Sequence, residues 1–158
     1  MKRIIVLFAL FPTFLLAQEL KLITSSQQTI NAGAFPSSTT NYLIQIQKEK
    51  RFNWHIDSLY SISSNKKIQY NITKVDSPNA VSPIYKQVKL FSKKDIGIFQ
   101  INFGTRKALG GGKPNAPVAN NLPPEDYSKG VVLFYTANKK KKELKISVFE
   151  KLESINAP

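Results

Sequence analysis

The chain has 158 residues, no cysteine and a formal net charge of +13, because 23 Lys and Arg stand against 10 Asp and Glu. The lack of cysteine excludes disulfides, thiol catalysis and thiolate zinc sites, so an apolar core alone must hold the fold together. The excess of positive charge favours anionic partners such as nucleic acid, phosphorylated glycolipid or acidic polysaccharide.

The first seventeen residues follow the pattern of an export signal. A basic start (MKR) precedes an apolar run that ends at Leu16, and Ala17 offers a small residue for cleavage. The run is shorter than the ~20 residues of a membrane-spanning helix, although an uncleaved anchor is the alternative. We therefore expect residues 1–17 to be a signal peptide and residues 18–158 to form one domain without a transmembrane span. The mature protein, with a charge of +11, would be periplasmic, at the outer surface or secreted.

Apolar and polar residues alternate along much of the remaining chain, as expected of strands with one buried face. In chain order, the predicted strands cover residues 19–24, 42–47, 52–57, 68–73, 85–91, 99–103, 131–135 and 144–148. The continuously apolar run 131–135 suits a central strand, and residues 149–155 would add at most one helical turn. About eight short strands predict an all-β fold, an antiparallel β-sandwich of the Ig-like or jelly-roll-like type.

Turns and one long loop are predicted between these strands. Hairpin turns are expected at residues 92–97 and 138–142, where Asn, Lys, Ser and Gly separate strand-like segments. The long irregular region 104–130 contains four prolines and five glycines. Loops of this length are uncommon unless they act as lids, binding loops or mobile segments.

Within the long region, the sequence KALGGGKPNAP is similar at first sight to a phosphate-binding loop. That motif requires a first glycine where Lys107 stands and a hydroxyl residue where Pro114 stands, followed by a helix. Proline-rich sequence follows instead. We interpret the segment as a flexible turn that carries one lysine.

His55 and Asp57 occupy alternate positions of a predicted strand and should share one face, opposite Trp54. A carboxylate beside an imidazole can orient it as a general base. No nucleophile motif accompanies the pair, and one histidine cannot form a multi-histidine zinc site. The alternative is a pair of polar residues on the solvent face of a sheet.

Glu125 and Asp126 could supply a carboxylate for acid–base catalysis, with Asp57 as the partner that a glycosidase requires. Adjacent acids after two prolines also form ordinary solvated turns. No motif for a metal or another cofactor is present, so we expect none.

The run from Lys139 to Lys142, comprising Lys139, Lys140, Lys141 and Lys142, is the strongest electrostatic feature and a candidate anion-binding site. A lysine-rich hairpin tip would also keep a sheet edge soluble. No aromatic residue is interleaved with these lysines in the sequence to stack bases. Trp54 and the other alternating aromatic residues form either the core or a carbohydrate platform.

The segments FLLAQ, NYLIQIQKEKRFNWHIDSLYSISSNKKIQYNITKV and VKLFSKKDIGIFQINFG resemble small uncharacterised exported proteins of Gram-negative, Bacteroidetes-type bacteria. The resemblance implies a β-rich envelope or secreted protein and assigns no catalytic residue. The leading hypothesis is a non-catalytic exported module of the cell envelope, with an anionic envelope polymer or another envelope protein as its partner. The alternatives are a polyanion binder that uses Lys139–Lys142 and a hydrolase that uses His55, Asp57 or Glu125-Asp126.

Overall fold

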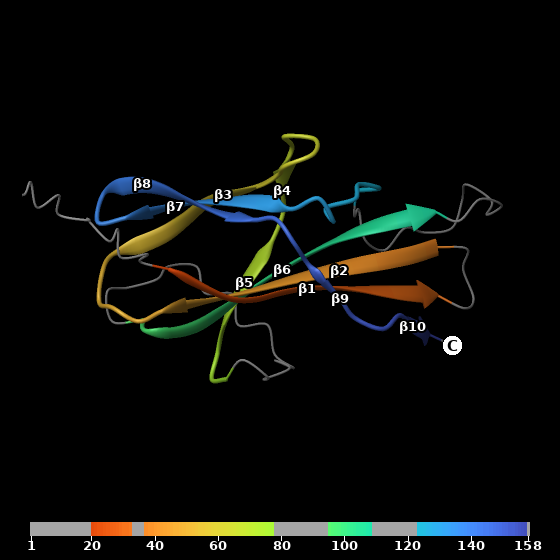
Figure 1. Cartoon of the computed structure of the whole chain (residues 1–158), viewed down its shortest axis with the longest axis horizontal. Coiled ribbons are helices and arrows are strands. Elements are labelled where there is room, and N and C mark those ends of the chain that lie inside the picture. Colours follow the sequence, from red (N-terminus) through yellow and green to blue (C-terminus); the bar gives the residue numbers. More distant parts are fainter. Residues whose placement is uncertain (1–19, 33–36, 78–94, 109–122, 158) are drawn as a thin grey trace, which may run out of the picture.

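The computed structural model of the chain describes residues 20–32, 37–77, 95–108 and 123–157. These residues form two β-sheets that lie face to face with the apolar core between them (Figure 1). The predicted all-β sandwich is therefore confirmed. None of the segments described contains a helix that is long and apolar enough to cross a membrane.

The larger sheet, sheet A, has the strand order β10-β1-β2-β6-β5, with β9 also paired to β1. Its strands are β1 (Lys21–Ala32), β2 (Ser37–Lys48), β5 (Asn71–Val75), β6 (Gly97–Ala108), β9 (Glu150–Lys151) and β10 (Ile155–Ala157). The four longer strands pair antiparallel, whereas β9 and β10 pair parallel with β1. Strands β9 and β10 therefore stand where the sequence predicted at most a helical turn.

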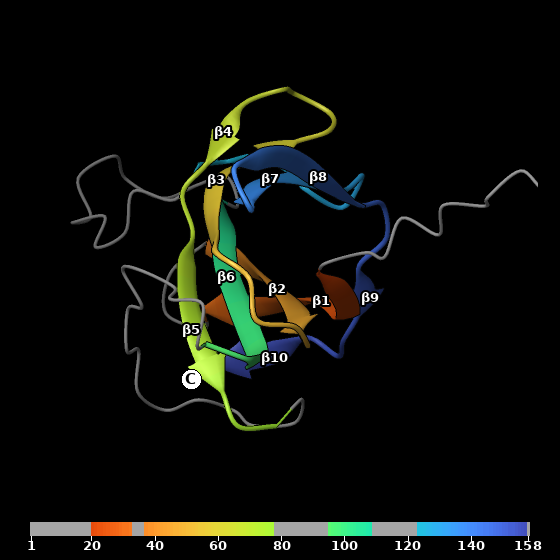
Figure 2. The same cartoon turned by 90° about the vertical axis from the view of Figure 1, so that its left-hand side faces the viewer.

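The smaller sheet, sheet B, is antiparallel throughout and has the order β4-β3-β7-β8. Its strands are β3 (Trp54–Ser61), β4 (Lys67–Ile68), β7 (Val131–Ala137) and β8 (Lys140–Ile146). The central position predicted for the apolar run of β7 is confirmed. Figure 2 shows β4 and β5 on one side of the molecule, where the chain passes from sheet B to sheet A.

The core is formed by alternate residues of both sheets. Ile44 and Ile46 of β2 share this core with Leu133 and Ile146 of sheet B, and all four side chains are buried. Trp54 is only 3% exposed, and its ring packs edge-on against Phe99 with 5.0 Å between centroids. Trp54 is thus a core residue, as one of its two interpretations held. Burial of such side chains stabilises the fold by about 1.5–3 kcal/mol each.

Two predicted strands differ from the observed ones because of changes in pairing. The pairing of β3 with β7 shifts between Ile56 and Ser58, so Asp57 forms a bulge. Before the bulge the even-numbered Trp54 is buried, whereas after it the odd-numbered Leu59 and Ser61 are buried. Strand β3 ends at Ser61. The predicted strand 68–73 is divided into β4 and β5 because the chain leaves sheet B and joins sheet A.

The limits of other elements also differ. Strand β6 includes Gly104–Ala108, so the region predicted as a long loop begins later. Strand β8 ends at Ile146, which leaves Val148 73% exposed while Phe149 is buried. The expected strand 85–91, residues 92–94 of the first hairpin and most of the glycine-rich segment lie outside the described residues.

Candidate anion-binding face

The outer surface of sheet B, on the side away from sheet A, carries aromatic rings and lysines in register. Pairing across the strands places its residues in three rows, which are Lys67–Tyr60–Val132–Lys145, Ser58–Phe134–Glu143 and His55–Thr136–Lys141. We call Tyr60, Lys67, Phe134, Lys141 and Lys145 the aromatic–lysine face. Residues distant in sequence thus lie on one surface.

Two aromatic rings lie at the centre of this face. Phe134 is 37% exposed because it points outward between the buried Leu133 and Tyr135. The bulge at Asp57 turns Tyr60 to the same side. The two rings make an edge-to-face contact with 5.8 Å between centroids and 85° between planes. Such a pair is a stable apolar platform in contact with solvent.

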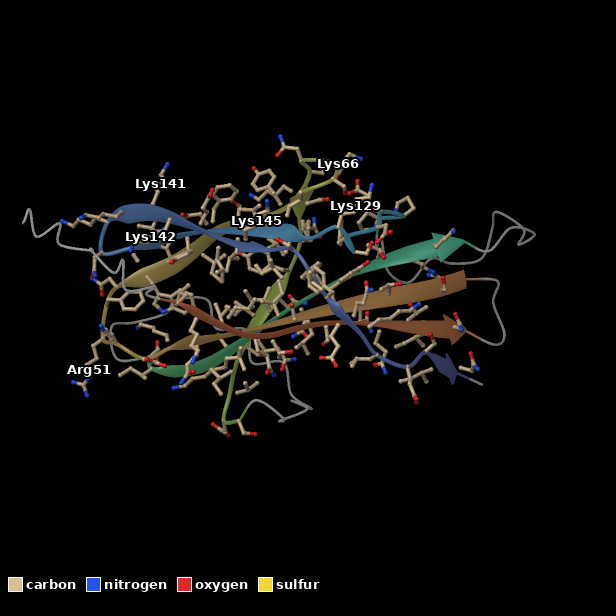
Figure 3. The ribbon with its side chains drawn as sticks, in the orientation of Figure 1. Arg51, Lys66, Lys129, Lys141, Lys142 and Lys145 are labelled. Atoms are coloured by element: carbon tan, nitrogen blue, oxygen red, sulfur yellow. The ribbon has the colours of Figure 1, made fainter. Side chains whose placement is uncertain are left out.

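Three exposed lysines surround the rings. Lys67 lies in β4, whereas Lys141 and Lys145 lie in β8. None of the three takes part in the ion pairs His55–Asp57 and Lys66–Glu125. Figure 3 shows Lys141 projecting from β8 away from sheet A. The strand rise separates Lys141 from Lys145 by about 13 Å, and three strand spacings separate Lys67 from Lys145 by about 14 Å.

The run Lys139–Lys142 does not form one cluster on this face. The predicted hairpin is confirmed, but its turn is only Asn138-Lys139, and Lys140 already belongs to β8. Lys141 pairs with Thr136 on the outer face, whereas Lys142 pairs with Tyr135 on the inner side. Strand alternation therefore assigns one lysine of the run to the aromatic–lysine face.

His55 and Asp57 lie at one end of the outer face, opposite the buried Trp54, as the sequence predicted. His55 Nε2 is 2.8 Å from Asp57 Oδ1, and the Thr136 hydroxyl donates to Asp57 Oδ2 at 2.9 Å. The two side chains are 61% and 31% exposed. The nearby Ser61 is buried and its hydroxyl contacts Ser63 at 2.9 Å. This arrangement matches polar residues on a solvated sheet face.

Glu125 and Asp126 point to different partners. Glu125 contacts Lys66 Nζ at 2.7 Å and accepts a hydrogen bond from Ser64, both in the segment that joins β3 to β4. The hydrogen bond from Lys66 is the main cause that lowers the pKa of Glu125. Asp57, the other carboxylate of the glycosidase hypothesis, lies four residues before the end of β3. It is therefore about 13 Å along the strand from the residue at which this joining segment begins.

Asp126 connects residues 123–130, the stretch that also contains Glu125, to sheet A. Its Oδ1 accepts the Ser128 amide at 2.8 Å and the Tyr42 hydroxyl at 3.2 Å. The Ser128 amide is the main cause that lowers the pKa of Asp126. The Tyr42 hydroxyl in turn accepts the amide of Tyr127 at 3.2 Å. The adjacent carboxylates therefore attach residues 123–130 to both sheets, which is a structural role.

The chemistry available to the candidate residues follows from these contacts. Among the residues that the structure describes, no group of three or more His, Asp or Glu is placed to hold a metal ion. The carboxylates proposed for a hydrolase are each engaged with separate neighbours. The outer face of sheet B instead combines cations with apolar rings, which is suited to binding.

Comparison of the chain with models of protein families, with curated proteins and with solved structures finds no match.

Proposed function

We propose that this protein is an exported binding module of the cell envelope and that it binds an anionic polymer on the aromatic–lysine face. The observation that carries this proposal is the pair formed by the half-buried Tyr60 and the exposed Phe134, which lies between Lys67, Lys141 and Lys145. The pair is formed by residues from separate strands, so the surface exists only in the folded protein.

The two components of the face contribute different parts of the binding energy. The lysines attract anionic groups over a distance of about 8–10 Å at moderate salt, and this attraction weakens as salt is added. The exposed ring of Phe134 offers an apolar surface against which the planar or ring-shaped part of a polymer unit can pack. The open outer surface of a sheet can accept an extended chain without a deep pocket.

Two features of the sequence support the envelope location. The first seventeen residues have the basic start, apolar run and small final residue of an export signal. The high positive charge suits a surface rich in anionic polymers. Mass analysis of the protein recovered from the envelope fraction tests this location, and we expect a chain that begins at Gln18.

The binding proposal is tested with a triple variant, Lys67→Gln, Lys141→Gln and Lys145→Gln. We expect this variant to bind heparin, used as a general polyanion, at least tenfold more weakly than the wild type at low salt. The slope of log affinity against log salt concentration should also be shallower by about two to three, because each phosphate or sulfate contact releases about one counterion.

The matched control removes the same charge from sheet A through Lys21→Gln, Lys74→Gln and Lys151→Gln. These lysines are exposed and lie in β1, β5 and β9. We expect the control to change heparin affinity by less than the triple variant of sheet B. Equal losses in the two variants would show a general effect of net charge and would contradict a defined face.

A further inference from the structure

We propose that the polymer bound on the aromatic–lysine face is a polysaccharide in which carboxylated sugars alternate with neutral sugars. This inference rests on the proposed function and adds the class of ligand. It follows from three features of the face, which are the spacing of the cations, the acidic residues between them and the geometry of the rings.

The lysines are widely spaced. Strand geometry sets about 13 Å between the backbone positions of Lys141 and Lys145, and about 14 Å between those of Lys67 and Lys145. A nucleic-acid duplex carries one charge about every 3.4 Å along each strand. Cations this far apart match a polymer whose anionic groups are also separated by neutral units.

Acidic side chains lie between the lysines. Glu143 is exposed, falls between Lys141 and Lys145 on β8 and pairs directly with Phe134. Asp57, held by His55 and Thr136, lies on the same surface. A polymer with a charge on every unit would bring an anion against Glu143, and such like-charge contacts are unfavourable.

A neutral sugar between two charged ones would avoid this repulsion. Ionised carboxylates have only acceptor atoms, and the hydroxyl groups of a sugar are donors. Glu143 can therefore accept hydrogen bonds from a neutral sugar that rests on Phe134, its cross-strand neighbour. The same residue that repels a uniformly charged polymer thus favours an alternating one.

The rings provide one stacking platform. Tyr60 and Phe134 stand at 85° to each other, so both cannot present a flat face to the same planar ligand. Proteins that bind single-stranded nucleic acid stack successive bases on several aromatic side chains. A single platform with cations on its flanks suits one sugar ring of an extended polysaccharide.

The test measures the affinity of the protein for three probes of equal total charge by titration calorimetry. The probes are hyaluronate oligosaccharide, with a carboxylate on alternate sugars, oligogalacturonate, with a carboxylate on every sugar, and oligothymidylate. We expect hyaluronate to bind about tenfold or more tightly than the other two, since the repulsion from Glu143 is avoided.

The variant Glu143→Gln distinguishes this ligand class from general attraction of anions. It should strengthen binding of oligogalacturonate and oligothymidylate and leave hyaluronate unchanged or weaker. The control Glu150→Gln removes an exposed acid of β9 on sheet A and should strengthen all three probes by a smaller and equal factor.

The outcomes separate the two proposals. Equal affinity for the three probes, or tightest binding of oligothymidylate, would overturn the ligand class while the binding of anionic polymers stands. If the protein binds neither the three probes nor heparin, the proposed function is overturned as well.

Discussion

Tyr42 shows how one side chain joins parts of the chain that are distant in sequence. Its buried ring stacks on Phe103 with 5.2 Å between centroids and meets Phe149 edge-on at 5.1 Å. Its hydroxyl donates to Asp126 and accepts the amide of Tyr127. The residue therefore fixes the segment before β7 against sheet A through both its ring and its hydroxyl.

Replacing Tyr42 with phenylalanine tests this connection. The change keeps the ring but leaves the buried amide of Tyr127 without its acceptor, so we expect a loss of about 1–3 kcal/mol in the free energy of unfolding. Urea denaturation measures the loss. The control Tyr70→Phe alters a half-buried tyrosine in the link between the sheets and should change stability by less. A free energy of unfolding that Tyr42→Phe leaves unchanged would show that the hydroxyl of Tyr42 is unimportant.

The stability of the protein should depend on pH at both extremes. Burial raises the pKa of Tyr42 from 10.0 to about 12, so the unfolded chain ionises first and stability falls as the pH rises from 10 to 12. The pKa values of Glu125 and Asp126 are lowered, so their contribution is complete above pH ~4.5 and is lost as the pH falls through their folded values. Denaturation midpoints measured from pH 2 to 12 check both limbs.

The variants that remove these groups identify the source of each limb. Tyr42→Phe should make the alkaline limb shallower, with the remainder due to Tyr70 and Tyr127, whose pKa values burial also raises. The double variant Glu125→Gln and Asp126→Asn should flatten the acid limb. An alkaline loss that persists unchanged in Tyr42→Phe would assign that limb to other residues.

The turn between β7 and β8 is a two-residue hairpin with both residues in the left-handed region. Asn138 has a φ of 50° and Lys139 a φ of 67°. Asparagine accepts this conformation, and glycine is favoured at the second position, whereas lysine is strained there. The composition of residues 138–142 predicted a turn, but the strain at Lys139 depends on a pairing register that composition does not reveal.

The variant Lys139→Gly should therefore raise the free energy of unfolding by about 1 kcal/mol. Thermal unfolding measures the gain. Lys140→Gly, one residue later in β8, should instead lower stability by about 0.5–1 kcal/mol, because glycine weakens a strand. Destabilisation by Lys139→Gly would show that the turn has a different conformation.

Local alternation predicted the strands whose pairing is regular. Ile44 and Ile46 in β2, and Phe99 and Ile101 in β6, face the core as their spacing requires. The bulge at Asp57 and the change of sheet between β4 and β5 were not predicted, since both depend on partners that are distant in sequence. Period-two patterns describe a strand only as long as its register does not change.

The candidate site was predicted only in part for the same reason. The proximity of His55 and Asp57 follows from spacing along one strand, and the structure confirms it. Phe134 and Tyr60 meet through the pairing of β7 with β3, so no local pattern groups them with Lys67 and Lys145. The available signal was the place of Phe134 in the apolar run of β7. When Leu133 and Tyr135 face the core, strand alternation makes Phe134 face outward.

Sheet B covers only part of sheet A. Strands β1, β2 and β6 continue beyond sheet B (Figure 1), and this half of sheet A is polar in sequence. Residues 37–41 of β2 are Ser, Thr and Asn, whereas the other half of the strand supplies the buried Ile44 and Ile46. The composition along each long strand therefore matches where the second layer ends, because only the covered half can bury large apolar side chains.

At the scale of the whole molecule, the two sheets that the described residues form each have an outer surface, and the proposed polymer binding belongs to that of sheet B. Backbone NMR during titration with hyaluronate oligosaccharide tests this assignment most directly. We expect amide shifts in β3, β7 and β8, centred on Tyr60, Phe134 and Glu143, and little change in β1, β2 and β6. Shifts centred on sheet A, or none at saturating oligosaccharide, would contradict the account.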